Sequence, residues 1–135
     1  MKGRVLGLDF GRKRVGVAIS DELRIAAHAL IVVPRAEAAE RVADLVEEYR
    51  VTEIVIGLPT TLAGREGESA LAARQFGHEI EAATGVAVEW VDERFTSHIA
   101  EHMMLKAGVR RRARRVNLDK VAATVILQSF LDRPR

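Results

Sequence analysis

The chain has 135 residues, no cysteine and a net charge of +2 at neutral pH. This length suits a single domain over residues 1–135 with a substantial core, and the lack of cysteine excludes disulfides and thiolate metal sites, as is usual in a reducing compartment. No apolar run approaches the length of a membrane span, and the first residues lead into a strand without a signal peptide, so we expect a cytoplasmic protein without membrane contacts.

The first third of the chain predicts three successive strands with short connections, the pattern of an antiparallel meander. The apolar runs that supply them are Val5–Asp9, Arg14–Ser20 and Ala27–Val33, the last of which stops at Pro34. A tight turn at Gly11–Lys13 is expected to join the first two strands.

Helices and strands alternate in the rest of the chain. The loop Thr60–Gly67 holds two glycines and is expected to be mobile, and the basic stretch Val109–Val116 is expected to be a loop. The order βββαβαβαα predicts an α/β fold, a five-stranded mixed sheet with helices on both faces. The predicted elements are a helix over residues 36–49, a buried parallel-type strand Glu53–Pro59, a helix Glu68–Thr84 stopped by Gly85, a strand Val86–Val91, a helix from Thr96 or Ser97 to Ala107, and a helix Leu118–Leu131 capped by Asn117.

Charge is strongly segregated along the chain. Residues 1–14 and 106–120 hold 12 of the 21 lysines and arginines but 2 of the 19 acids, Asp9 and Asp119, which gives these two segments together a net charge of +10. Such sorting favours a polyanionic partner. The sequence therefore predicts that the protein binds nucleic acid, RNA or DNA or both.

Three separated carboxylates are candidates for a metal site. Asp9 ends the first strand, Glu93 follows the fifth, and Asp119 lies in the first turn of the last helix. If strands one and five run side by side and parallel, these acids meet at one sheet edge, where they could hold the two ions of a nuclease. Asp119 could instead favour the helix dipole, and Glu93 could pair with Arg94 on the surface. Asp9 is harder to explain structurally, because a carboxylate closing a buried strand needs a partner.

Four motifs in chain order resemble the YqgF/RuvX family. They are Leu8-Asp9-Phe10-Gly11, Gly57-Leu58-Pro59, Asp92-Glu93-Arg94-Phe95-Thr96, and Asp119-Lys120-Val121-Ala122-Ala123 with Ile126-Leu127-Gln128. The resemblance covers essentially the whole chain and implies a ribonuclease H-like fold, with activity as a pre-rRNA nuclease or a Holliday-junction resolvase. It also implies that Asp9, Glu93 and Asp119 are the catalytic metal ligands, with Asp92 as a reserve candidate.

Basic residues flank two of these acids. They are expected to grip backbone phosphates on either side of the scissile bond, without reading the base sequence. A solvated basic loop is the alternative explanation for a short charge run. The candidates are Arg12, Lys13 and Arg14 after Asp9, and Arg110, Arg111, Arg112, Arg114 and Arg115 before Asp119.

Three other functions compete with the nuclease hypothesis. His98-Ile99-Ala100-Glu101-His102 matches the H-x-x-E-H signature of zinc proteases, but short motifs often match by accident. Asp9-Phe10-Gly11 with its hairpin could bind nucleotide, as in ATPases of the actin and sugar-kinase class, although those place the nucleotide between two such domains. A non-catalytic nucleic-acid-binding module would explain the arginines but not the three carboxylates.

The sequence favours a hydrolase that uses two Mg²⁺ or Mn²⁺ ions to direct water at a phosphodiester. The resemblance implies processing of the 5′ end of pre-16S rRNA, with Holliday-junction resolution as the runner-up. A monomer or a weak homodimer is expected, since a junction resolvase needs paired sites and a single-strand processor does not.

Overall fold

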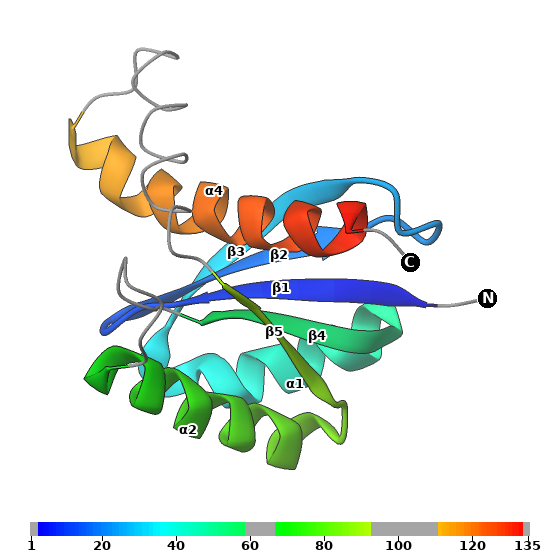
Figure 1. Ribbon diagram of the computed structural model, residues 1–135, viewed down its shortest axis with the longest axis horizontal. Helices are drawn as coiled ribbons and strands as arrows, with labels where there is room; N and C mark the ends of the chain where they lie inside the picture. Colours follow the sequence, from blue (N-terminus) through cyan, green and yellow to red (C-terminus); the bar gives the residue numbers. More distant parts are fainter. Residues whose placement is uncertain (1–2, 59–66, 93–110, 134–135) are drawn as a thin grey trace.

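In the described part of the chain, a mixed β-sheet lies between one long helix on one face and two helices on the other (Figure 1). The computed structural model describes residues 3–58, 67–92 and 111–133, with side chains in the last range described from residue 120 onward. Among these residues, no helix combines the length and apolar character that a membrane span needs. In chain order the elements are β1 (Arg4–Phe10), β2 (Arg14–Ser20), β3 (Ala27–Pro34), the 3-10 turn η1 (Arg35–Glu37), α1 (Ala38–Tyr49), β4 (Val51–Leu58), α2 (Glu68–Thr84), β5 (Val88–Asp92) and α4 (Arg111–Asp132).

The sheet has five strands in the order β3-β2-β1-β4-β5, with β1 at its centre. The meander β1-β2-β3 is antiparallel, whereas β4 and β5 join it in parallel through the crossover helices α1 and α2. Because β1, β4 and β5 all run in the same direction, their carboxyl ends reach the same edge of the sheet. Ligand sites in open α/β sheets form outside such carboxyl ends.

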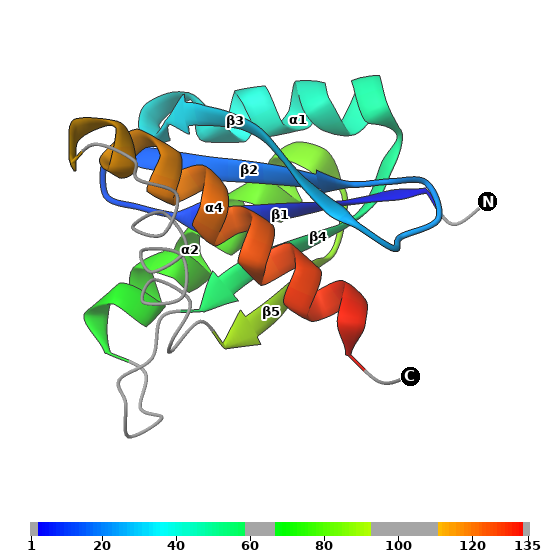
Figure 2. The same cartoon turned by 90° about the horizontal axis from the view of Figure 1, so that it is seen from above.

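Alternation of side chains along β1 divides the core between the two faces of the sheet. Leu6 and Leu8 pack against Val42 of α1 and Ile80 of α2. Val5 instead belongs to the core beneath α4, with Ile126, Leu127 and Phe130 among its members. Figure 2 shows α4 crossing the sheet diagonally on this second face.

Most of the predicted elements are confirmed. The helix Glu68–Thr84 has the predicted bounds, and Gly85 ends it in the left-handed conformation at φ 73°. The helix expected over residues 36–49 begins with a 3-10 turn, because Pro34 precedes it and no side chain caps it. The fifth strand starts and ends slightly later than predicted, at Val88–Asp92. The helix expected to end at Ala107 and most of the loop expected to be mobile lie outside the described residues.

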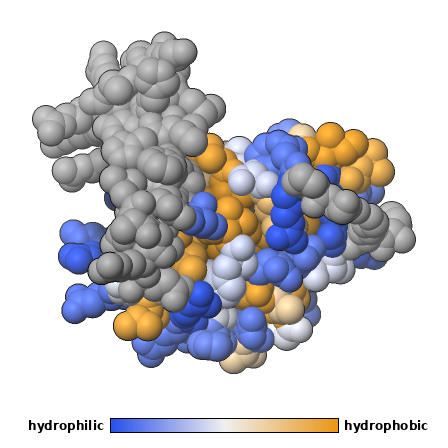
Figure 3. All heavy atoms as spheres, viewed as in Figure 1, coloured by the Kyte–Doolittle hydropathy of each residue, from blue (hydrophilic) through white to orange (hydrophobic). Residues whose placement is uncertain are grey.

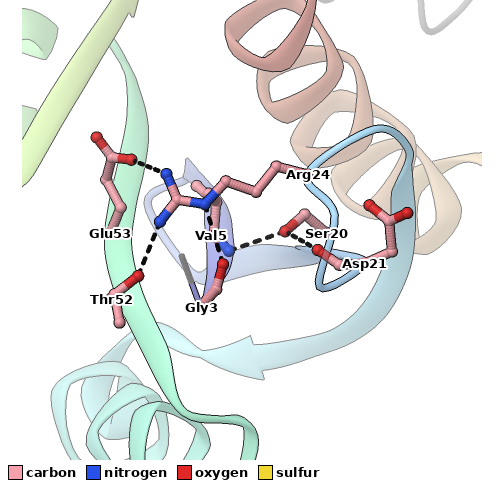
Figure 4. Close-up of polar contacts among 7 residues, drawn as sticks. All are labelled: Gly3, Val5, Ser20, Asp21, Arg24, Thr52 and Glu53. Atoms are coloured by element: carbon pink, nitrogen blue, oxygen red, sulfur yellow. Dashed lines mark hydrogen bonds and ion pairs between the residues drawn. The ribbon is translucent and has the colours of Figure 1, made fainter. Parts of the chain in front are cut away.

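A polar network holds the opposite edge of the sheet, where β1 begins (Figure 4). Arg24 donates hydrogen bonds to the carbonyl oxygen of Gly3 at 3.0 Å, to Thr52 Oγ1 at 2.8 Å and to Glu53 Oε1 at 2.7 Å. Buried Ser20 accepts a hydrogen bond from the Val5 N–H at 2.9 Å. This network ties the β2–β3 connection to β1 and β4, so the end of the sheet away from the candidate site is firmly held.

The β2–β3 connection is also fixed from within. The N–H groups of Ile25 and Ala26 donate to Asp21 Oδ1 at 2.7 and 3.2 Å, and the bond from Ile25 is the main cause that lowers the pKa of this carboxyl. Gln128 of α4 adds two more bonds, to the Ala27 N–H and the Ile25 carbonyl. The C-terminal half of α4 is thereby anchored over the amino end of β1.

Candidate active site

Asp9 lies next to last in the central strand β1, at the edge where the parallel strands end. Leu6 and Leu8 face α1 and α2, whereas Val5 faces α4, so alternation places half-buried Asp9 on the α4 face. The following residue, Phe10, lies on the α2 side, where its ring stacks on Phe76 at 4.7 Å between centroids. The prediction that this strand carries its acid to the sheet edge is confirmed.

Strand β4 separates β1 from β5, so the condition that strands one and five lie side by side is not met. Both strands nevertheless run parallel to β4, and their carboxyl ends reach one edge. From Ile54 to Leu58 every residue of β4 is buried and none is charged, which suits a strand in the interior of the sheet. Asp92 pairs with Leu58 and shares the α2 side with Trp90, opposite the face of Asp9. Glu93 is the next residue and lies outside the described residues.

Helix α4 runs antiparallel to β1, so its N-terminal half lies over the edge that carries Asp9 (Figure 1). Two contacts fix this direction. Gln128, near the C-terminus of α4, binds Ala27, which pairs with Ser20 beside the start of β1. Further along β1, Gly7 lies beneath Leu127 and Ala123. Position 119 precedes Ala123 by one helical turn, and it therefore lies toward the carboxyl end of β1.

The contact at Gly7 sets how closely α4 approaches the sheet. A Cβ atom at this position would lie 2.6 Å from Leu127 Cβ and 3.1 Å from the Ala123 carbonyl oxygen. Real side chains do not come so close, so the helix can rest on β1 at this depth because residue 7 is a glycine. The distance between α4 and the Asp9 end of β1 therefore depends on the absence of a single side chain.

The predicted turn after β1 is confirmed and presents two cations at the same edge. The Gly11 N–H donates to the Arg14 carbonyl at 2.9 Å, and a Cβ on Gly11 would meet that oxygen at 2.6 Å. Arg12 and Lys13 are exposed at the tip, whereas Arg14 is half-buried in β2. Because the turn is tight, Arg12 and Lys13 stay at the same end of the sheet as Asp9.

The basic stretch before Asp119 is helical from Arg111 onward, so the loop predicted there is wrong over residues 111–116, and Asn117 is not the cap of the last helix. Arginine and alanine are among the strongest helix formers, and the charge of the run concealed this preference. The backbone places Arg111, Arg112, Arg114 and Arg115 in the first turns of α4, while Arg110 lies outside the described residues.

Arg35 is a further cation at this edge that the sequence analysis missed. Its N–H donates to the Lys13 carbonyl at 2.9 Å, and its guanidinium lies 4.6 Å from the centroid of the Phe10 ring. A signal for it was available, because antiparallel pairing of strands two and three must bring the end of the third strand to the Gly11–Lys13 turn. Arg14 indeed pairs with Pro34, the residue before Arg35.

The chemistry of this edge fits a hard divalent cation. Asp9 offers carboxylate oxygens, and the chain has no cysteine to compete for softer metals. Among the residues whose side chains are described, no three His, Asp or Glu groups gather closely enough to bind a metal ion. Glu93 and the side chain of Asp119 are outside that part of the chain, so the predicted trio stays a prediction.

The sequence has close relatives over almost its entire length. A profile of the RuvX family, described as "Holliday junction resolvase", matches residues 3–133. The chain belongs to the RuvX family. A relative from Anaeromyxobacter dehalogenans (strain 2CP-C) is 47% identical over 96% of this chain and 97% of its own, and one from Roseiflexus sp. (strain RS-1) is 42% identical over 98% and 96%. Each bears the name "Putative pre-16S rRNA nuclease".

Solved structures place this RuvX member in the ribonuclease H-like fold, as predicted. Thermus thermophilus RuvC in complex with a Holliday junction substrate superposes with a TM-score of 0.59 at 17% identity, covering 96% of this chain and 93% of that one. The large terminase nuclease from phage G20c gives a TM-score of 0.52 at 11% identity, over 90% and 80% of the two chains. At such identities the likeness establishes the fold alone.

The family assignment also bears on the competing hypotheses. Membership in RuvX confirms the family predicted from the sequence, and the interpretation of the zinc-protease motif His98–His102 as an accidental match stays a prediction. That motif lies outside the described residues. The cytoplasmic location expected from the sequence stays a prediction.

Proposed function

We propose that this protein is a divalent-metal-dependent nuclease that hydrolyses phosphodiester bonds, with Asp9, Glu93 and Asp119 as metal ligands. The observation that carries the proposal is the placement of Asp9 at the carboxyl end of the central strand, on the face beneath α4. The N-terminal half of α4, which contains position 119, lies over the same edge. Asp92 lies on the other face of the sheet, and this favours its neighbour Glu93 as the third ligand.

The carboxylates would hold Mg²⁺ or Mn²⁺ at this edge. Bound there, such ions supply the positive charge that activates water and stabilises the leaving oxygen. The backbone of Asp9 belongs to β1, which is held on both sides by its pairing with β2 and β4. Arg12 and Lys13, exposed on the adjoining turn, are suited to bind backbone phosphates beside the scissile bond.

The substrate we propose is precursor 16S rRNA, cut at its 5′ end, because relatives at 42–47% identity bear the name of a pre-16S rRNA nuclease. Holliday-junction cleavage is the second candidate and is favoured by the description of the RuvX family. The two differ in symmetry, since a junction presents two equivalent strands and requires a dimer. A monomer or weak homodimer suits the first candidate.

A cleavage panel tests this proposal. Labelled single-stranded RNA, single-stranded DNA, duplex DNA and a four-way junction are incubated with the protein and Mg²⁺ or Mn²⁺, with EDTA as the control. We expect metal-dependent cleavage, fastest on single-stranded RNA. Cutting confined to the junction would favour the second candidate. Binding without any cleavage under either metal would indicate a non-catalytic module and contradict the proposal.

The arginines at the start of α4 are expected to set affinity and to leave the chemical step largely unchanged. Arg111 and Arg114 are three residues apart, so they share one side of the helix. Replacing both by alanine should weaken binding of all sequences alike and flatten the salt dependence of log K by up to ~1.4, at ~0.7 per phosphate of a single strand. The measurement is fluorescence anisotropy with labelled RNA between low and moderate salt.

The matched control for that pair is Arg41→Ala with Arg133→Ala, which removes the same charge from exposed positions on α1 and at the end of α4. It should change the salt slope far less, and turnover at saturating substrate should stay near the wild-type value in both double variants. If the double variant at positions 111 and 114 binds RNA normally but no longer cleaves it, these arginines take part in the chemical step instead.

A further inference from the structure

A pocket opens beside the candidate active site, on the face of the sheet away from α4. It has a volume of about 560 Å³ and lies between the end of β1, the turn after it, η1 and the first turn of α2. This size falls within the ~300–1,000 Å³ typical of small-molecule sites. Its lining includes Phe10, Gly11, Arg12, Arg35, Ser69 and Ala72.

The pocket is contiguous with Asp9 but does not contain it. Phe10 lines the pocket and is the next residue after Asp9, and the two side chains leave β1 on opposite faces. A strand of nucleic acid that passes over the sheet edge at Asp9 would reach the pocket on the other face of β1. Asp9 and the pocket therefore lie at the same end of the sheet.

Arg35 places its guanidinium against an aromatic ring at the pocket. Its guanidinium lies 4.6 Å from the centroid of Phe10, whose ring stacks on Phe76 at 4.7 Å. The backbone of Arg35 is tied to the Lys13 carbonyl, so both ends of the residue are held. A guanidinium held in this way presents a planar surface on which a nucleobase can stack, and it can bind a phosphate with its outer N–H groups.

The other lining groups suit a nucleotide as well. Arg12 adds a second exposed cation for a phosphate, and the Glu68 carboxylate and Ser69 hydroxyl offer hydrogen-bonding groups to a base edge. The visible face of the molecule mixes hydrophilic and apolar side chains (Figure 3), and Leu71 of α2 is an exposed apolar residue. Cations beside an aromatic ring are a combination that single-stranded nucleic acid sites use.

We propose that this pocket holds one unpaired nucleotide of the substrate strand, adjacent to the scissile phosphate, with its base stacked on Arg35. The inference rests on the proposed nuclease function and specifies its substrate class. A base inside a duplex is stacked on its neighbours and cannot enter the pocket without being extruded, so the pocket selects single-stranded or splayed strands over continuous duplex.

The test compares Arg35→Ala with a matched control, Arg133→Ala. Arg133 lies 4.0 Å from the centroid of Phe130, so the control also removes one charge and one cation–aromatic contact, but at the opposite end of the molecule. Binding of labelled single-stranded RNA is compared with binding of an RNA hairpin whose loop is a non-nucleotide linker, so that the hairpin offers no unpaired base, and both are measured by anisotropy in EDTA. Melting temperatures of all variants establish that each is folded.

We expect Arg35→Ala to weaken single-strand binding about tenfold, as loss of one base stack does. Hairpin binding should fall no more than in Arg133→Ala. Arg35→Lys keeps the charge but lacks the plane, so it should restore less than half of the lost binding free energy. Ala72→Leu, which fills the pocket without a change of charge, should also weaken single-strand binding more than hairpin binding.

Equal losses on single strand and hairpin, or full recovery in Arg35→Lys, would overturn the proposal, because either result would mean a simple phosphate contact. Cleavage by the wild-type protein with Mg²⁺ and Mn²⁺ is followed in parallel. A protein that binds single strands through Arg35 but cleaves none would contradict the nuclease function and leave the pocket standing. Cleavage by the wild-type protein together with unchanged single-strand binding in Arg35→Ala would overturn the pocket proposal and leave the nuclease function standing.

Discussion

Asp9→Asn is expected to lower cleavage by at least about 10³-fold while leaving the protein folded. The amide has nearly the same shape as the carboxylate, but it lacks the charge that holds a divalent cation, and loss of several kcal/mol of transition-state stabilisation corresponds to a factor of this order. Asp9 is half-buried and lies outside the apolar core clusters, so the substitution should move the melting temperature little. The measurement is turnover at saturating substrate with Mg²⁺ or Mn²⁺.

Two further variants sharpen this result. Asp44→Asn removes the same charge from an exposed position on α1 and should leave turnover unchanged. Asp92→Asn should cost far less than Glu93→Gln, because Asp92 lies on the face of the sheet opposite Asp9. Full activity of pure Asp9→Asn protein would remove Asp9 from the ligand set. A severe loss in Asp92→Asn together with an active Glu93→Gln would exchange the roles of these two neighbours.

The strands and their order along the chain could be predicted because each is a short apolar run closed by a turn residue. Asp9 could be placed at a sheet edge for the same reason, since Gly11 ends the run within two residues. The order of strands across the sheet could not be predicted from these patterns. Periodicity reports which face of a strand is buried but does not identify the strand beside it, and β4 lies between β1 and β5.

Two features of the candidate site were beyond the local sequence for other reasons. The charge of the run from Arg111 suggests a loop, whereas its intrinsic helix propensity predicts a helix. The run is helical, as its propensity and its continuity with the packed part of α4 favour. Arg35 carries no motif. Its place beside Asp9 follows from the pairing of β2 with β3, which brings residues more than twenty positions apart to one edge.

The geometry of the edge depends on packing behind it. Asp9 is fixed by β1, whereas position 119 belongs to α4, so the spacing of the two is set by how deeply the helix lies on the strand. Gly7 controls that depth, because its missing side chain lets Leu127 and the Ala123 carbonyl come within contact distance of the β1 backbone. A glycine in the middle of a central strand otherwise weakens the strand, and its presence here is explained by the closeness of α4.

Gly7→Ala is therefore expected to reduce both stability and turnover. The new methyl carbon would lie 2.6 Å from Leu127 Cβ, an atom fixed to the helix backbone, so α4 itself must move away from β1. Overpacking of this kind costs ~1–3 kcal/mol, which for a chain of this size lowers the melting temperature by roughly 4–12 °C. A displacement of about 1 Å at a catalytic group can cost up to ~10²-fold in rate, so we expect kcat to fall by roughly 10–100-fold at a temperature where the variant is fully folded.

Gly77→Ala is the matched control for this experiment. Its added methyl carbon would lie 2.7 Å from the Trp90 ring, a comparable clash, but on the α2 side and against the far end of a side chain that can rotate. It should lower the melting temperature less than Gly7→Ala does and leave kcat within about twofold of the wild type, because α4 does not have to move. If Gly7→Ala is destabilised but turns over normally, the spacing between β1 and α4 does not govern the chemistry. Position 119 would then tolerate displacement, which a metal ligand does not, and Asp119 would have to leave the proposed ligand set.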